Sequence, residues 1–295
     1  MREISIAVLV FEKPLRFGRV HLTMPLDLRD GALGTRKRVD CGKEALLDRR
    51  GKHSRSFGAN LATRMFSPPS NLSTDAFEVL CAGIVGAFLC GIWASAKRDG
   101  VDAGPRTAKV AGLTLLWFGL LAFVVSSGWL NEKPMPRVPL FFALVNGVSL
   151  GVGLSPIGGW LAQSISLGWL VQFQAFRFPL ELILHSWVLQ GSIPETMTWT
   201  GANWDIISGI TALLLAPFAT KSRAAAWVAN IVGIVLLANV ARVAVLSSPL
   251  PFGWHVSPPL VLAFHLPYAA ILPVCVGGAL LGHVVLTRAL IARKD

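Results

Sequence analysis

The stretch AFEVLCAGIVGAFLCGIWASA, residues 76–96, decides the fold class, because it is long, apolar and carries a single charged residue. A membrane-spanning helix needs about 20 consecutive, mostly apolar residues. Six further runs of this kind follow, at approximately 110–130, 138–162, 166–189, 205–220, 224–246 and 258–287, of which the fifth is the shortest. The sequence therefore predicts an all-α, polytopic transmembrane helix bundle with about seven spans.

The composition indicates the same class. Hydrophobic residues make up 53% of the 295 residues and charged residues only 15%, and the mean hydropathy is +0.59. Soluble globular domains contain about 25% charged residues. The net charge of +11 does not indicate a nucleic-acid-binding protein, because the basic residues after the N-terminal segment mostly flank apolar runs. We expect the lipid bilayer as the partner of this chain, and no nucleic acid.

The distribution of basic residues predicts how the bundle is oriented. One set of connections carries Lys97, Arg98, Arg106, Lys109, Lys221, Arg223, Arg288, Arg293 and Lys294. The alternate connections carry only Lys133 and Arg137. Because Lys and Arg are enriched in cytoplasmic loops, the first set is predicted to face the cytoplasm. The chain is then a multi-pass protein of the cell (inner) membrane with a cytoplasmic C-terminus, and loops 190–204 and 247–257 lie outside.

Residues 1–74 differ from the rest, since they hold 14 of the 27 Lys and Arg residues and seven acidic residues. So basic a tail disagrees with an outer location before the first span. Three interpretations remain open. Long tails obey this charge rule poorly, so the tail can lie outside despite its charge. Alternatively, translation begins at Met65, or residues 1–74 are a disordered cytoplasmic arm and the first span must be reassigned. In each case, residues 75–295 form the transmembrane domain.

Ionisable side chains inside the apolar runs are the main indication of a functional site. Arg177, Glu181 and His185 are spaced four residues apart, so they share one helix face. A charge in hydrocarbon costs at least about 2.5 kcal/mol, so we expect these groups to face the bundle interior, with Arg177 and Glu181 paired. Polar residues expected at similar depth in other spans are Asn203, Asp205, Asn239, Arg242 and His265. We therefore predict one polar cavity in the outer half of the bundle, formed by Glu181, His185, Asp205, Arg242 and His265, with Arg177 beneath them.

Three short motifs lie between residues 203 and 272: SGITALL from Ser208, NVAR from Asn239 to Arg242, and an FH pair ending at His265. This layout resembles exosortases and archaeosortases, multi-pass enzymes that cut and transfer C-terminally sorted proteins at the outer membrane face. The resemblance implies Arg242 and His265 as site residues, and a membrane-anchored protein or a lipid as substrate. The family's nucleophilic Cys is not matched, because Ile207 stands in its place.

The first functional hypothesis is therefore an enzyme at the outer leaflet. His265 would act as general base and Arg242 would stabilise developing negative charge. Asp205 or Ser208 would carry the reactive oxygen or orient the histidine, and Cys81 is a more distant candidate nucleophile.

Three other hypotheses remain open. A proton- or solute-coupled transporter would use the stripe from Arg177 to His185, but only Gln172 and Gln174 continue it inward. A metal or haem site would use His185, His265 and Glu181, although no metal-binding motif is present and the sequence identifies no cofactor. In a structural or assembly subunit, the polar residues would only hold helices together.

Overall fold

The computed structural model describes residues 66–132 and 134–293, and every regular element in this part of the chain is helical. The all-α prediction is therefore confirmed. The proposed start at Met65 and the basic segment before it lie outside the described residues. The first described helix, α2 (Asn71–Arg98), begins within the segment that the sequence assigns to the tail.

Five helical segments in the described part are long and apolar enough to cross a membrane. They are α2, α3 (Ala103–Ser126), α5 (Pro134–Leu154), α10 (Arg223–Ser247) and the segment Tyr268–Ala292, which ends in α11 (Gly277–Ala292). In α5 the spanning part is Met135–Leu154. Large apolar side chains point outward from them; Leu115, Leu116 and Phe123 of α3 are 69–71% exposed. A bilayer would cover such surfaces, so the chain is a multi-pass membrane protein.

Two expected spans are not single long helices. The run 166–189 is divided into α7 (Leu167–Phe173), a 3₁₀ turn (Gln174–Phe176) and α8 (Arg177–Leu189). Pro179 explains the division, because its ring lacks an N–H donor and would clash with the carbonyl four residues earlier. The run 205–220 is α9 (Ile206–Ala219), which has only 14 residues. Five of the seven expected spans are thus present as long helices.

The third and seventh predicted spans also need correction. The third ends early: α5 stops at Leu154, and Ser155 caps the separate short helix α6 (Pro156–Ser164). The seventh begins late, because residues 248–267 form an irregular loop with one 3₁₀ turn, and helical structure starts at Tyr268. His265, which the sequence places inside the seventh span, therefore lies in this loop.

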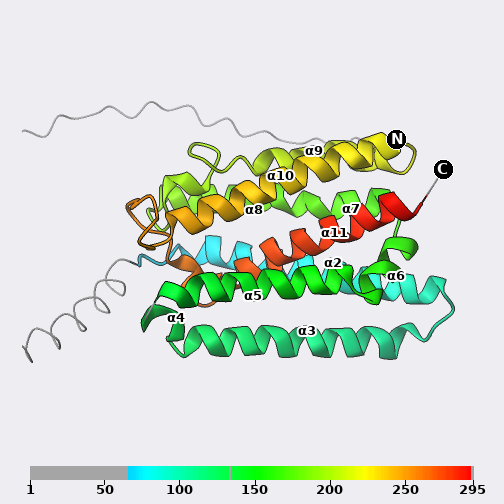
Figure 1. Cartoon of the computed structure of the whole chain (residues 1–295), viewed down its shortest axis with the longest axis horizontal. Helices are drawn as coiled ribbons and strands as arrows, with labels where there is room; N and C mark the ends of the chain where they lie inside the picture. The colour runs from blue at the N-terminus through cyan, green and yellow to red at the C-terminus, as the bar shows by residue number, and fades with distance from the viewer. Residues whose placement is uncertain (1–65, 133, 294–295) are drawn as a thin grey trace, which may run out of the picture. The chain divides into compact units, whose positions relative to one another are not determined.

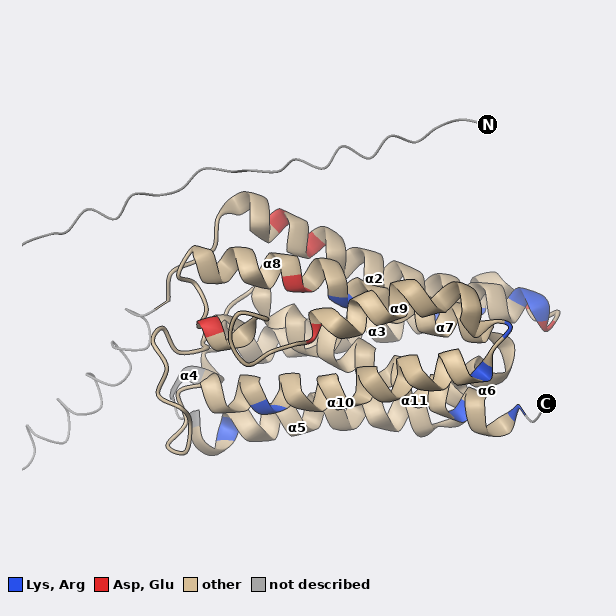
Figure 2. Cartoon of the chain, turned by 90° about the horizontal axis from the view of Figure 1, so that it is seen from above, with Lys and Arg blue, Asp and Glu red and all other residues tan. Residues whose placement is uncertain are grey.

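The helices lie side by side, with α11 between α5 and α10 (Figure 1). Helix α9 packs against α7 and α10, and α2 packs against α3 and α8. We call the end that carries loops 190–205 and 248–267 the loop end. We call the opposite end the basic end, because most Lys and Arg residues of the described part gather there, beside the C-terminus (Figure 2).

Candidate functional site

A buried ion pair joins α8 to the start of α9. Arg177, the first residue of α8, donates from Nε to Oδ2 of Asp205 at 2.6 Å and from Nη2 to Oδ1. The expected pair of Arg177 and Glu181 is therefore wrong. Glu181 lies one turn further along the same helix as Arg177. Asp205 lies at the end of the loop before α9, and its carboxylate faces the planar guanidinium in a bidentate arrangement.

The other side of Arg177 contacts α10 and α11. Its Nη1 donates to the Gly233 carbonyl at 2.9 Å and lies 3.1 Å from Nε2 of His283. Because a guanidinium can only donate, Nε2 of His283 accepts and the proton sits on Nδ1. Nδ1 then donates to Oδ1 of Asn230 at 2.9 Å, and Nδ2 of Asn230 donates to Oγ1 of Thr287 at 2.7 Å. Hydrogen bonds thus continue from Arg177 toward the basic end.

His283 and Asn230 were missed by the sequence analysis, although both are fully buried in the structure. The signal that identified Arg177 applies equally to them, because each places a polar group inside an apolar run. Gly233 gave no such signal. A Cβ at this position would collide with the His283 ring and lie 3.3 Å from Nη1 of Arg177, so this close packing needs glycine.

Asn203 links Glu181 to the ion pair. Its Nδ2 donates to Oε1 of Glu181 at 2.8 Å and to the Met197 carbonyl at 3.0 Å, while its Oδ1 accepts from the Asp205 backbone N–H at 3.2 Å. Glu181 is only 1% exposed. Its second oxygen, Oε2, is buried and has no hydrogen-bond partner among the described residues.

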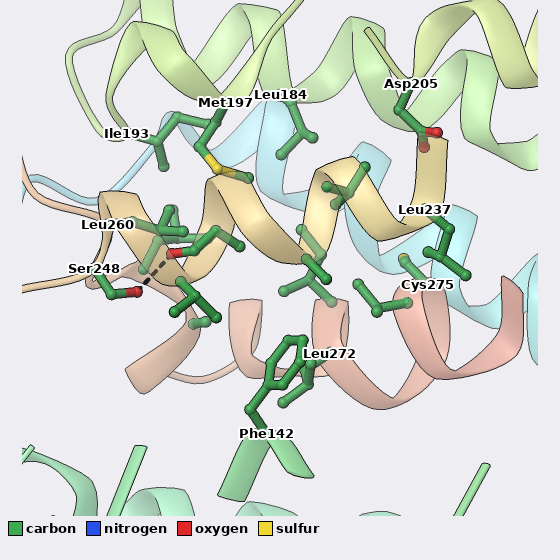
Figure 3. A pocket seen from close by; sticks show the side chains of 18 of the residues that line it. Phe142, Leu184, Ile193, Met197, Asp205, Leu237, Ser248, Leu260, Leu272 and Cys275 are labelled. Atoms are coloured by element: carbon green, nitrogen blue, oxygen red, sulfur yellow. Dashed lines mark hydrogen bonds between the residues drawn. The ribbon is translucent and has the colours of Figure 1, made fainter. Parts of the chain in front are cut away.

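A cavity of about 120 Å³ lies beside the ion pair. Its charged lining residues within the described part of the chain are Arg177, Glu181 and Asp205. The rest of the wall is almost entirely apolar and comes from α5, α8, α10, the loops 190–205 and 248–267 and the start of the last helix. Figure 3 shows Asp205 and Ser248 near opposite ends of this lining. Ser248 uses its hydroxyl to donate to the Ala244 carbonyl at 2.8 Å. The ionisable groups therefore lie together at one end of an apolar cavity.

The two histidines predicted for the cavity have aromatic neighbours instead. His185 stacks on Trp199 with ring centroids 4.4 Å apart, and His265 stacks on Phe66 at 4.0 Å. Neither lines the cavity. His265 lies outside the cavity because it belongs to loop 248–267 and not to a helix. Burial in this loop lowers its pKa below the ordinary value.

Arg242 also lies apart from the cavity. Its guanidinium donates to Oδ1 of Asn239 at 2.8 Å and lies over the Trp254 ring at 5.7 Å. Nδ2 of Asn239 donates to the Ala202 carbonyl at 2.8 Å. The predicted group of five is thus divided: only Glu181 and Asp205 lie in the cavity.

The candidate nucleophile Ser208 lies in the first turn of α9 and is 3% exposed. Its Oγ has no hydrogen-bond partner in the described part of the chain, and the residue does not line the cavity. Its catalytic role, like those of Asp205, Arg242 and His265, stays a prediction. Within residues 66–132 and 134–293, no three His, Cys, Asp or Glu side chains are grouped as metal ligands.

No family model, curated protein or solved structure matches this chain. The resemblance to exosortases therefore receives no support from these comparisons.

Proposed function

We propose that this multi-pass membrane protein binds a membrane-borne substrate at the centre formed by Arg177, Asp205 and Glu181. The observation that carries the proposal is Oε2 of Glu181, a buried oxygen in the cavity wall that has no hydrogen bond to any described residue. Leaving such an atom unsatisfied costs about 1–3 kcal/mol. Each such atom in a native structure requires an explanation, and a ligand that supplies the partner is a direct one.

The surroundings of Glu181 support a fixed binding site rather than loose packing. Arg177 is held by Asp205 on one side and by Gly233 and His283 on the other. These contacts join α8, α9, α10 and α11, so the charged groups are positioned before any ligand arrives. Such preorganisation is what an electrostatic site needs, because its groups do not have to reorient on binding.

The apolar side chains around the cavity support a substrate that comes from the bilayer. Val138 and Phe142 of α5 form one wall of the cavity, and Val240 and Ala244 of α10 form another. These two helices do not pack closely against each other in the described structure; each packs on α11 instead. We therefore propose that the substrate enters between α5 and α10.

The bundle is further proposed to have seven spans, with α7–α8 and α9 crossing as well, and to expose its basic end to the cytoplasm. Glu181 lies eight residues before the last residue of α8, about 12 Å from the loop end at 1.5 Å per residue. The centre then belongs to the outer half of the membrane.

Carbodiimides test this proposal, because they attach covalently to protonated carboxyl groups that they can reach. A membrane-soluble reagent, dicyclohexylcarbodiimide, should modify Glu181 in the purified full chain, and a water-soluble carbodiimide should not. Peptide mass spectrometry locates the adduct. Glu181→Gln should abolish it, whereas the matched variant Glu195→Gln, at an exposed glutamate, should leave it unchanged. If Glu181 stays unmodified while exposed carboxyls react, the site is not open to the bilayer.

Transport is a second candidate, favoured by one observation. The segment before Arg177 continues the stripe inward with only Gln172 and Gln174. The hydrogen bonds through His283, Asn230 and Thr287 of α10 and α11 extend it toward the basic end. Asn230→Leu would interrupt this chain. In a proton-coupled transporter it should abolish proton flux into proteoliposomes but leave carbodiimide labelling of Glu181 intact.

The sortase-like enzyme differs from both candidates in its dependence on Ser208. Ser208→Ala should abolish a peptide-cleaving activity while preserving the cavity, because Ser208 is not part of the cavity wall. Loss of cleavage only in Glu181→Gln, and not in Ser208→Ala, would remove the motif-based assignment.

A further inference from the structure

We propose that the substrate of this site is a lipophilic amine, an apolar chain whose protonated amino group pairs with Glu181. This inference rests on the proposed function and adds the chemical class of the ligand. It follows from the charge at the polar end of the cavity and from the apolar wall that leads away from it.

The polar end has an unbalanced negative charge. Arg177 and Asp205 neutralise each other through their bidentate pair. His283 adds no charge, because its Nε2 accepts from Arg177 and only Nδ1 carries a proton. Among the described residues, the Glu181 carboxylate is then balanced by nothing stronger than the Asn203 amide. In an apolar surrounding a lone carboxylate is costly, so the site favours a ligand that brings a positive charge.

The second carboxylate oxygen of Glu181 indicates that the cation must also donate a hydrogen bond. Oε2 of Glu181 accepts no hydrogen bond within residues 66–132 and 134–293, so a positively charged head group with an N–H satisfies both its charge and its hydrogen bond. A carboxylate or phosphate head would meet the like charges of Glu181 and Asp205, because Arg177 is already occupied on both sides. Alcohols could satisfy the hydrogen bond but not the charge.

The wall beyond Glu181 matches the rest of such a molecule in polarity and in length. The lining runs along α10 from Leu237 and ends at Ser248, the residue after the helix; these eleven steps span about 16 Å at 1.5 Å per residue. Every α10 side chain in this lining is apolar, and the Ser248 hydroxyl bonds to the Ala244 carbonyl. An alkyl chain placed there would bury its surface against the protein, with its amino group at Glu181.

The experiment measures equilibrium retention of radiolabelled N,N-dimethyldodecylamine by the purified full chain in detergent, with empty micelles as background. Dodecanol and dodecanoate are the competitors, since they carry the same chain with a neutral or an anionic head. The amine should bind at about one per chain. Neither competitor, at an excess of about tenfold, should displace it, as expected when a charge-assisted hydrogen bond is decisive.

Variants test where the amine binds. Glu181→Gln should weaken binding by about tenfold or more, whereas Glu195→Gln should have no effect. Ala244→Phe, which fills the cavity wall without touching Glu181, should also abolish binding. Its matched control is Val235→Phe, at a position of α10 that is 61% exposed. A cooperative thermal unfolding transition is the check that each variant is folded.

Two outcomes would overturn the inference: equal retention by Glu181→Gln and the parent chain, or displacement of the amine by dodecanol or dodecanoate at that excess. Carbodiimide labelling of Glu181 separates this failure from that of the proposed function. If Glu181 is labelled but the amine shows no preference, only the ligand class is wrong. If Glu181 is not labelled, the site itself fails.

Discussion

Arg177 and Asp205 form a bidentate ion pair across 28 residues of sequence, with side chains that are only 1% and 5% exposed. Their pairing fixes where α9 starts relative to α8. A buried pair of this kind is costly to break from one side, because the remaining charge stays buried without a partner. Replacing both partners by apolar residues removes that cost.

Asp205→Asn is therefore expected to destabilise the protein by about 3–5 kcal/mol, measured by thermal or denaturant unfolding in detergent. Asp75→Asn, at an exposed position of α2, is the control and should change little. The double variant Arg177→Met, Asp205→Leu should recover most of the stability. If it also recovers the biological activity, the pair is only structural; a stable but inactive double variant supports a functional site.

Gly233→Ala is expected to disturb the same network from α10. The added methyl group collides with the His283 ring and crowds Arg177, so a loss of about 1–3 kcal/mol in unfolding free energy is expected. Gly147→Ala in α5 is the matched control, because a Cβ at Gly147 meets nothing within 4 Å. Equal stability of the two variants would contradict the close packing around Arg177.

His265 should make stability depend on pH. Burial lowers its pKa below the ordinary value of 6.5, so below about pH 6.5 the unfolded chain binds more protons than the folded one. The free energy of unfolding should then fall as the pH drops through this range. His265→Phe keeps the stacking on Phe66 and should remove this part of the pH dependence.

The control for His265 is His255→Asn, in the same loop. His255 has a backbone φ of +51°, a conformation that asparagine tolerates well. An unchanged pH dependence in His265→Phe, or its loss in His255→Asn, would show that another group is responsible.

Much of the fold could be predicted from the sequence, because apolar runs of sufficient length report directly on helices in a bilayer. The runs 76–96 and 224–246 lie within α2 and α10. Hydropathy does not report backbone geometry, however. The segment from Pro258 to Pro267 is apolar enough to be assigned to a span, yet its prolines cannot support a regular helix and it forms a loop.

The site could be predicted only in part. Arg177 and Glu181 were identified because charged residues are rare inside apolar runs, and both lie in the cavity wall. Their partners depend on which helices are neighbours, which spacing within one helix cannot reveal. His283 shows a different limit, since it carried the same signal as Arg177 and was overlooked.

The last prediction concerns how many times the chain crosses the membrane. With seven spans, loop 190–204 lies outside; if α7–α8 and α9 do not cross, it lies inside. Both arrangements place Lys221 inside and Phe252 outside, so only the loop between α8 and α9 distinguishes them. The structure favours the outer location, because Thr196 in this loop and Ser247 at the end of α10 share a hydrogen bond of 2.7 Å between their hydroxyls.

Single cysteines at Glu195, Lys221 and Phe252, introduced into a cysteine-free chain, can be labelled with a membrane-impermeant maleimide in intact cells. Glu195→Cys and Phe252→Cys should react, and Lys221→Cys should react only after the cells are permeabilised. All three native residues are exposed, so the substitutions should leave the fold intact. Protection of Glu195→Cys while Phe252→Cys reacts would reduce the bundle to five spans, and the reverse pattern at Lys221 and Phe252 would invert it. Either result would move Glu181 out of the outer half of the membrane.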